Sequence, residues 1–478
     1  MERQVLERRF AMLIDGEAVH GTSSFEVNNP ATAAAFAICP RADEALADRA
    51  VAAAKTAFPA WSALPIETRA GAVAKLADDM EARASEFASL LTAEQGKPLD
   101  QAMFEVMASV FTLRAFAAMR PEMKILKDEA GHRVIEHRTP LGVVVAITPW
   151  NFPLVLAMNK IGPALVTGNT VVLKPAPTTP LTSLLFGELC AQVLPRGVFN
   201  VICDQNDLGA HLTAHRDVAK VAFTGSTATG KKVLGSSAES LKRVTLELGG
   251  NDAAIVLDDV PPAVAARKVF AGAMANAGQI CVAIKRAYVP ETMYDAFCDE
   301  IAAIARSAIV DNGANQGAQI GPVQNLTQFE KIKALLADAQ ERGTVVAGGQ
   351  ALDRPGYFIA PTIVRDLDDD APLVREEQFG PVLPVLKYRE IDEVIARAND
   401  SDYGLGGTVW GSDVARATEV AMKIDSGTVW VNQHLAIDPN IPFRGAKHSG
   451  IGSELGQAGL HEYTQPHIVN AVPLEASP

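Results

Sequence analysis

Three residues of this sequence carry side chains that could perform covalent chemistry if the fold brings them together. Cys281 follows the glycine-containing segment 276–280 and could be an accessible nucleophile, although a buried structural thiol is the commoner role for a cysteine. Glu247 precedes two glycines and would suit a general base that activates water, or it could be an ordinary turn residue. Asn151 lies between two prolines, where its amide N–H could bind an oxyanion or its loop could simply pack Trp150.

The segment GSTATG at 225–230 could bind a phosphate group. It follows an apolar run and precedes an expected helix, and free backbone N–H groups at a helix N-terminus favour anions. Gly225, Ser226 and Gly230 would form this turn, but Thr227 occupies the place of the middle glycine in the usual GxGxxG pattern. The segment alone is therefore equally consistent with a plain strand-to-helix turn.

Two further positions could contact the sugars of a nucleotide. Lys174 ends the apolar run 170–173 and could reach ribose hydroxyls or a 2′-phosphate, unless it is a surface lysine beside Pro175. Glu377 could accept hydrogen bonds from a ribose while Phe379 packs on the cofactor, unless both belong to an acidic surface loop.

These residues have to be positioned by strands that alternate with helices. Between residues 142 and 248 the pattern predicts a parallel sheet covered on both faces, and ligands bind beyond the carboxyl ends of such strands. The predicted strands are 142–147, 170–173, 198–202, 218–223 and 243–246, with a helix over 181–193. A second α/β lobe is predicted from strands at 252–257, 286–289 and 427–431 and helices at 262–276 and 292–307. Helices are also expected over 43–93.

Composition excludes several classes of protein. The chain has 478 residues with ordinary globular usage, and its net charge of −13 disfavours nucleic-acid and membrane-surface partners. The longest uncharged run, 141–159, is interrupted by prolines, which argues against a membrane span. The five cysteines form no CxxC pair or Cys/His cluster, so no metal site is predicted. No secretory signal is recognised, so the expected location is cytoplasmic.

Taken together and in this order, the segments resemble the aldehyde dehydrogenase superfamily over nearly the whole chain. Matching pieces run from VNNPAT at 27–32 to SGIG at 449–452. The separation between Glu247 and Cys281, 281 − 247 = 34 residues, is similar to that in the hydrolytic, NAD(P)-dependent branch. The resemblance implies an α/β protein with a parallel-sheet, Rossmann-like cofactor domain, an α/β catalytic domain and a small β oligomerisation element.

The resemblance also implies roles for the residues above. Cys281 would attack an aldehyde, Asn151 and the Cys281 backbone N–H would hold the oxyanion, and Glu247 would activate the water that hydrolyses a thioester. NAD is the expected cofactor, with NADP possible because Pro177 stands where NAD-preferring relatives often have an acidic residue. The implied cofactor contacts are Ile147, Thr148, Pro149, Trp150, Lys174, Pro177, Gly225, Ser226, Gly230, Leu248, Glu377 and Phe379.

The substrate pocket and the possible activities are less closely defined. The pocket implied by position consists of Phe152, Val155, Leu156, Asn159, Met274, Ile280 and Val282, a mostly apolar set that favours aliphatic or aromatic aldehydes. No arginine cluster suggests a dicarboxylic semialdehyde, although Lys285 and Arg286 lie close to Cys281 in sequence. Acyl transfer to coenzyme A is one alternative, but relatives of that kind usually lack the glutamate found at 247. An inactive protein and an alcohol dehydrogenase are the others, and neither fits the residues present.

The resemblance implies three parts and an oligomer. Residues 1–120 and 141–249 would form the NAD(P)-binding domain, 250–447 the catalytic domain, and 121–140 with 448–478 the oligomerisation element. A strand near 133–137 is expected at an exposed or oligomeric edge, and the tail 463–472 could pair with another subunit. Open strand edges need partners, so a homodimer or homotetramer is expected.

Overall fold

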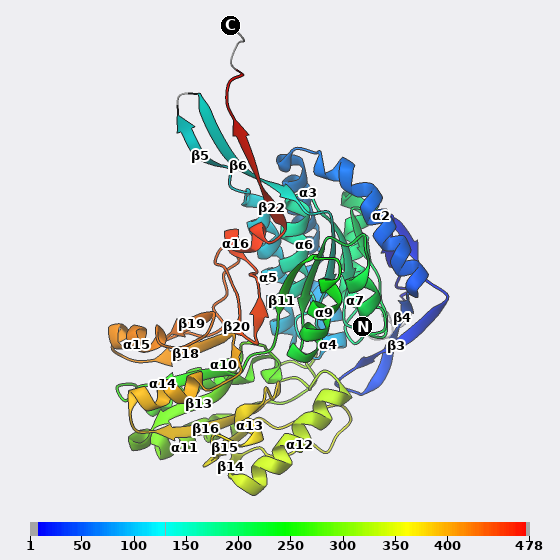
Figure 1. Cartoon of the computed structure of the whole chain (residues 1–478). Helices are drawn as coiled ribbons and strands as arrows, with labels where there is room; N and C mark the ends of the chain where they lie inside the picture. The colour runs from blue at the N-terminus through cyan, green and yellow to red at the C-terminus, as the bar shows by residue number, and fades with distance from the viewer. Residues whose placement is uncertain (1–7, 130, 475–478) are drawn as a thin grey trace.

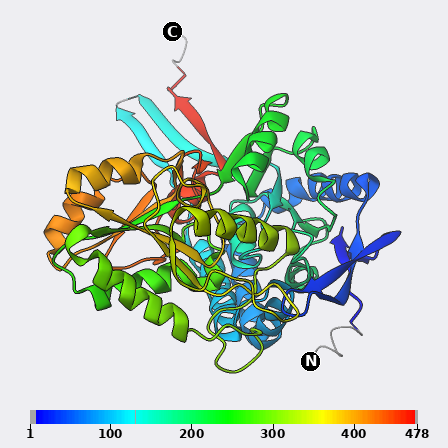
Figure 2. The same ribbon diagram turned by 90° about the horizontal axis from the view of Figure 1, so that it is seen from below.

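The computed structural model describes residues 8–129 and 131–474 as two α/β lobes and a projecting β ribbon (Figure 1). The ends of the predicted ranges 1–120 and 448–478, at residues 1–7 and 475–478, lie outside the described residues, as does residue 130. Viewed from below, the lobe containing α12 to α15 lies beside the lobe built from the first half of the chain (Figure 2). The functional side chains predicted from the sequence come from both lobes.

The first lobe is built on an eight-stranded sheet in the order β2-β1-β9-β8-β7-β10-β11-β21. The strands from β9 to β11 run parallel, while β1 and β21 are antiparallel to their neighbours. The strands are β1 (Met12–Ile14), β2 (Glu17–Val19), β7 (Val143–Ile147), β8 (Thr170–Lys174), β9 (Phe199–Val201), β10 (Lys220–Thr224), β11 (Arg243–Glu247) and β21 (Gly450–Ile451). Every residue of β7, β8 and β10 is buried, which is typical of parallel strands covered on both faces.

Helices cover this sheet and pack on one another. They are α2 (Glu44–Ser62), α3 (Ile66–Ala82), α4 (Ala84–Gln95), α5 (Leu99–Ala118), α6 (Val155–Val166), α7 (Leu181–Val193), α8 (Gly209–Ala214) and α9 (Thr227–Ala238). Helices α2, α6 and α7 contact the central strands, and α5 packs on α6 and α3. Helix α5 therefore has an inner position in the lobe, and a charged residue of this helix supports the candidate active site.

The second lobe holds a seven-stranded sheet in the order β14-β15-β16-β13-β12-β18-β19. Only β14 runs antiparallel to its neighbour. The strands are β12 (Asp252–Val256), β13 (Ile284–Pro290), β14 (Thr344–Ala347), β15 (Thr362–Arg365), β16 (Val382–Tyr388), β18 (Gly406–Trp410) and β19 (Thr428–Val431). Its helices are α10 (Pro262–Met274), α11 (Tyr294–Ser307), α12 (Leu326–Arg342), α13 (Pro372–Arg375), α14 (Ile391–Asn399) and α15 (Val414–Ala421), with 3-10 turns η1 (Ala275–Gly278) and η2 (Glu291–Met293).

A three-stranded ribbon in the order β22-β6-β5 projects from the molecule (Figure 1). It comprises β5 (Lys124–Glu129), β6 (His132–Pro140) and β22 (Thr464–Ala471). The strand expected at an exposed or oligomeric edge near 133–137 is β6, which is the central strand of the ribbon, so that placement was wrong. The tail forms β22, which pairs with β6 along one edge, and its pairing with another subunit stays a prediction. The long strand β6 pairs through both of its hydrogen-bonding edges with strands of its own chain, β5 on one side and β22 on the other.

Smaller elements complete the chain. They are β3 (Ser23–Asn29), β4 (Ala34–Arg41), β17 (Tyr403–Gly404), β20 (Ala446–Lys447) and α16 (Gly456–His461). The β3–β4 hairpin lies on the far side of the first lobe from the ribbon (Figure 1).

Candidate active site

Cys281 is presented by a strained turn between α10 and β13. Helix α10 ends in η1, where Asn276 and Ala277 adopt left-handed backbone angles with φ of 50° and 54°. Gly278 also has positive φ, and a side chain there would overlap the backbone of Gly380. Such conformations persist only where the surrounding structure holds them. Cys281 itself is half-buried, and burial raises the pKa of its thiol to about 12.

Asn151 is bonded directly to the turn that carries Cys281. It lies in the loop between β7 and α6, and its Nδ2 donates to the carbonyl oxygen of Gln279 at 2.9 Å. In return, Asn276 Nδ2 donates to the carbonyl oxygen of Asn151 at 3.1 Å. These reciprocal hydrogen bonds join the two lobes at the point where the predicted nucleophile and oxyanion donor lie.

A buried ion pair that the sequence analysis missed supports the Asn151 loop. Lys97 and Glu105 have side chains with 0% exposure and are bonded to each other. Lys97 Nζ also donates to the carbonyl oxygen of Asn151 at 2.9 Å and lies 3.6 Å from the centre of the Phe152 ring. Glu105 accepts from the backbone N–H of Leu154 at 2.9 Å and so caps the start of α6. The feature of the sequence that could have revealed this ion pair is a glutamate, Glu105, on the apolar face of α5.

Glu247 is the last residue of β11, and its carboxylate is buried. Neither of its oxygens has a hydrogen-bond partner among the residues that the structure describes. Burial and the neighbouring Glu454 raise its pKa well above the ordinary value, against the opposing influence of Lys160. An unpartnered buried carboxylate is costly to keep, which makes a functional role for Glu247 the better explanation.

Glu454 belongs to a buried polar group near Glu247 that the sequence analysis also missed. Lys160 Nζ is bonded to Glu454 and donates to Thr224 Oγ1 at 2.6 Å. Asn159 Nδ2 donates to Glu454 Oε2 at 3.3 Å, while Asn159 Oδ1 has no partner among the described residues. Asn159 was predicted to line the substrate pocket. Its amide nitrogen is therefore used in a hydrogen bond, whereas its amide oxygen has no partner among the described residues.

The carboxyl end of the first sheet has the shape and donors that a dinucleotide needs. Ser226 caps α9 by accepting from Thr229 N at 3.3 Å, and the α9 N-terminus faces outward there. A side chain at Gly230 would overlap Leu248, so the helix can approach the strand only with glycine. The Trp150 and Phe379 rings meet edge to face with their centres 5.3 Å apart. The remaining predicted contacts, Ile147, Thr148, Pro149 and Gly225, lie at the ends of β7 and β10.

Lys174 does not project freely at the end of β8. Its ammonium is bonded to Asp204 Oδ1 at 2.6 Å, and the two side chains are only 4% and 0% exposed. The other oxygen of Asp204 accepts from the backbone N–H of Leu208 at 2.9 Å. The charge of Lys174 is thus neutralised within the site, while Pro177 is half-buried nearby in sequence. Asp204 was not identified from the sequence, because nothing there linked it to Lys174.

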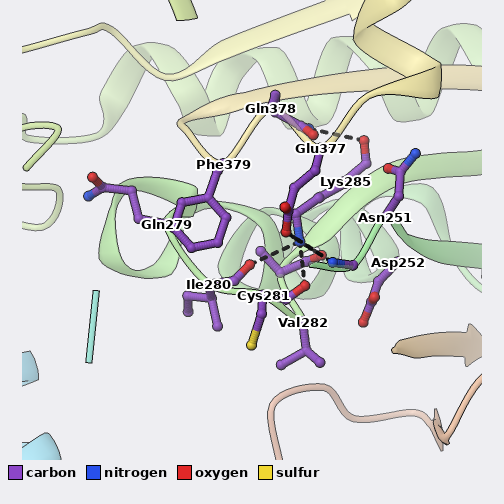
Figure 3. Close-up of polar contacts among 12 residues, drawn as sticks. Asn251, Asp252, Gln279, Ile280, Cys281, Val282, Lys285, Glu377, Gln378 and Phe379 are labelled. Carbon is purple, nitrogen blue, oxygen red and sulfur yellow. Dashed lines mark hydrogen bonds and ion pairs between the residues drawn. The ribbon is translucent and has the colours of Figure 1, made fainter. Parts of the chain in front are cut away.

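Glu377 and Lys285 meet on the other side of the Cys281 turn (Figure 3). Glu377 Oε1 accepts from Gly250 N at 3.0 Å and lies 3.8 Å from Lys285 Nζ. Lys285 otherwise donates to backbone carbonyls of the turn, and Arg286 donates to the carbonyls of Asn251 and Ala398. Both cations are therefore committed to the protein backbone and are not available to a substrate carboxylate.

The apolar residues that pack next to Cys281 are only partly those that the sequence predicted. Phe152, Ile280 and Val282 pack together with the half-buried Cys281. Met274 packs instead in the core beneath α10, and Val155 and Leu156 are half-buried outside that group. The structure adds residues that were not predicted, namely Leu405, Trp430, Leu435 and Phe443.

A polar cavity of about 570 Å³ lies between the start of α9 and the second lobe. Its lining includes Ser226, Glu377, Lys331 and Tyr403. It therefore borders two of the predicted cofactor contacts. No group of three or more potential metal ligands occurs among residues 8–129 and 131–474, and none of the helices in those ranges is long and apolar enough to cross a membrane.

Comparison with known proteins agrees with this architecture. Residues 18–469 match the model of the aldehyde dehydrogenase family. The chain is 40% identical over 471 residues to phenylacetaldehyde dehydrogenase of Pseudomonas fluorescens, covering 95% of this chain and 94% of that protein. It superposes on the NAD+ complex of Bacillus cereus aldehyde dehydrogenase with a TM-score of 0.95 and 37% identity, with 98% of each chain covered. The structure of an E. coli NADP-dependent enzyme matches with a TM-score of 0.94 and 34% identity, covering 97% of this chain and 98% of that one.

The chain belongs to the aldehyde dehydrogenase family. The family, the fold and the enzyme class that the motifs predicted, an NAD(P)-dependent aldehyde dehydrogenase, are confirmed.

Proposed function

We propose that this enzyme oxidises an aldehyde to a carboxylic acid through a thioester on Cys281, which water activated by Glu247 then hydrolyses. The observation that carries the proposal is the pairing of a half-buried thiol with a buried carboxylate whose oxygens lack partners among the described residues. Both groups influence one another electrostatically, since Glu247 is among the groups that raise the pKa of Cys281. A thiol can add to a carbonyl, and its thioester is labile enough to be cleaved.

In the first step the Cys281 sulfur forms a bond to the aldehyde carbon and loses its proton to water. The carbonyl oxygen becomes negatively charged and is held by Asn151 Nδ2 and the backbone N–H of Cys281. The reciprocal bonds between the Asn151 loop and the turn before Cys281 keep this donor in place. Bound NAD(P) supplies the hydride acceptor that converts the adduct into a thioester.

In the second step water attacks the thioester carbon while Glu247 takes a proton from that water. The acid product is released, and Cys281 is again a free thiol. The raised pKa of Glu247 suits this role, because it makes the carboxylate a stronger base toward water than an ordinary glutamate. Lys160 and Glu454 lie behind Glu247 and set its charge environment.

Replacement of Asn151 by Ala tests the oxyanion donor. We expect kcat to fall by about 10²- to 10³-fold, because one donor to a developing oxyanion is lost. Steady-state kinetics would measure the loss, and Asn28→Ala, at an exposed position of β3, is the matched control. Unchanged kcat in Asn151→Ala would remove this residue from the mechanism.

We propose NAD as the main cofactor. Lys174 would lie at the adenosine ribose, where its bond to Asp204 leaves no net positive charge for a 2′-phosphate. Ser226 would face the pyrophosphate, and Glu377 with Phe379 would hold the nicotinamide riboside. The NAD+ complex of the Bacillus cereus relative supports NAD as the cofactor.

Replacement of Pro177 by Glu tests how the 2′ group is read. We expect the kcat/KM ratio of NADP to NAD to fall by about tenfold, because a carboxylate would repel the 2′-phosphate and accept from ribose hydroxyls. Kinetics with both cofactors, together with calorimetric binding of each, would measure the ratio. An unchanged ratio would show that position 177 does not contact the 2′ group.

The substrate we propose is a small aliphatic or aromatic aldehyde, since the group around Phe152, Ile280 and Val282 is apolar. Formation of reduced cofactor across a panel of aldehydes, with NAD and NADP in parallel and without coenzyme A, tests the activity directly. Turnover in that assay supports hydrolysis. Turnover only after addition of coenzyme A would favour acyl transfer instead.

We also propose a homodimer or homotetramer assembled through the ribbon β5-β6-β22. The outer strand β5 leaves an open edge, and Met123, Ile125 and Leu126 beside it are at least half exposed. The domain division at residues 1–120 with 141–249, 250–447, and 121–140 with 448–478 belongs to the same proposal, as does a cytoplasmic location.

A further inference from the structure

Lys285 lies against the nucleophile turn and has no part in the steps above. It is the second residue of β13, and its side chain is 1% exposed. Its ammonium donates to the carbonyl oxygens of Ile280 at 2.9 Å, Cys281 at 2.6 Å and Ala283 at 3.4 Å. All three carbonyls belong to the turn that presents Cys281, so the lysine closes this turn from β13.

The same ammonium faces the carboxylate proposed to hold the nicotinamide ribose. Glu377 Oε1 lies 3.8 Å from Lys285 Nζ, and the next residue, Gln378, donates from Nε2 to the carbonyl oxygen of Lys285 at 3.2 Å. Figure 3 shows Lys285 between the Cys281 turn and the segment of Glu377 and Gln378. One side chain thus contacts both the nucleophile turn and the cofactor segment.

Lys285 is also the cation that opposes the acidic groups around the thiol. The charged groups that influence Cys281 are Glu377, Asp252 and Glu247, which raise the pKa of the thiol, and Lys285, which lowers it. Lys285 is likewise the foremost charge that lowers the pKa of Asp252 and of Glu377 against burial. Without this ammonium, a thiolate would form facing three acidic groups and no compensating cation from this set.

We propose, on the basis of the thioester route above, that Lys285 is a positioning residue that holds the Cys281 turn and Glu377 together as one unit. Its ammonium supplies the positive charge against which the Cys281 thiolate forms. Because one side chain contacts both segments, a change at Glu377 is felt at the thiol, and the two sites are energetically coupled.

The experiment measures alkylation of Cys281 in the cofactor-free enzyme, so it does not depend on turnover. Iodoacetamide is added between neutral and mildly alkaline pH, and modification of Cys281 is followed by mass spectrometry. For a thiol that is mostly protonated, the rate follows the thiolate fraction, so an upward pKa shift of about one unit slows alkylation about tenfold. We expect Lys285→Met to show this loss and Lys285→Arg to recover most of it.

A second reagent separates charge from mere loosening of the turn. Iodoacetate carries a negative charge, so its rate relative to iodoacetamide should fall further in Lys285→Met, where uncompensated carboxylates face the thiol. Lys333→Met is the matched control, because Lys333 is an exposed lysine of α12 that pairs with Glu330 and contacts neither Glu377 nor the Cys281 turn. In this control the rate and the reagent ratio should match those of the unaltered enzyme.

Glu377→Gln keeps the test decisive if Lys285→Met does not fold. Removing the Glu377 charge should leave Lys285 free to act on the thiol and should accelerate alkylation several-fold. The proposal would be overturned if Lys285→Met had the same alkylation rate and the same reagent ratio as the unaltered enzyme. Slower alkylation of Glu377→Gln than of the unaltered enzyme would also overturn it. A failure of the thioester route would be seen differently, as absence of aldehyde oxidation by the unaltered enzyme while the alkylation differences persist.

Discussion

Replacement of Cys281 by Ala should lower aldehyde oxidation by more than about four orders of magnitude. The methyl group of alanine cannot add to a carbonyl, so no adduct forms and no hydride donor is created. Cofactor binding should remain close to that of the unaltered enzyme, because the proposed cofactor contacts lie on other segments. Steady-state assays would measure the loss, and calorimetric titration with NAD would measure the retained affinity.

Cys298→Ala is the matched control for that variant. Cys298 is buried in α11 of the same lobe and packs in a core away from Cys281. Its replacement removes one sulfur from the core and should leave turnover within about twofold at a small cost in stability. Persistent turnover in Cys281→Ala would overturn the nucleophile assignment, and equal loss in both variants would point to general damage.

Replacement of Glu247 by Gln should slow hydrolysis of the thioester by about 10²- to 10⁴-fold. The amide cannot take a proton from water, whereas the attack of Cys281 on the aldehyde does not require this carboxylate in the proposed route. Rapid mixing should therefore show one burst of reduced cofactor followed by a slow steady state. Glu300→Gln is a suitable control, because Glu300 is an exposed carboxylate on α11 in the other lobe. An undiminished steady state in Glu247→Gln would exclude Glu247 as the base.

The pH dependence of the same step follows from the raised pKa of Glu247. Only the deprotonated carboxylate can act as a base, and its raised pKa moves that form to higher pH. The rate of thioester hydrolysis should therefore rise with pH through the pKa of Glu247 and level off above it. In Glu247→Gln this rise should disappear, which single-turnover measurements across neutral pH would detect.

Local patterns predicted much of the sheet-and-helix order because they depend on the chain's own periodicity. Helix α7 occurs at Leu181–Val193, as predicted, and the apolar β-branched runs became β7, β8 and β10. Strand pairing was harder. The tail strand β22 was recognised, but its partner β6 lies more than three hundred residues earlier, and nothing local indicates that pairing.

In the site, too, features that depend on local sequence could be predicted and contacts between separate segments could not. Cys281, Glu247 and Asn151 follow recognisable turns and strand ends, so their positions could be predicted. Their supports could not, because each is a buried charge whose partner lies 8, 30 or 294 residues away and is not indicated by any local pattern. Lys97 with Glu105, Lys160 with Glu454, and Lys174 with Asp204 are such pairs. Charged residues in a sequence are normally expected at the surface, and only the folded contacts show that these are not.

The high thiol pKa of Cys281 has a consequence for the enzyme at rest. Because burial raises the pKa of this thiol, most of it is protonated at neutral pH. Peroxide oxidises thiolates rather than thiols, so the resting nucleophile should be slow to form sulfenic acid. The buried Cys190 and Cys298 also have raised pKa values. The enzyme should therefore tolerate oxidative stress and aerobic storage better than an enzyme that keeps its nucleophile ionised.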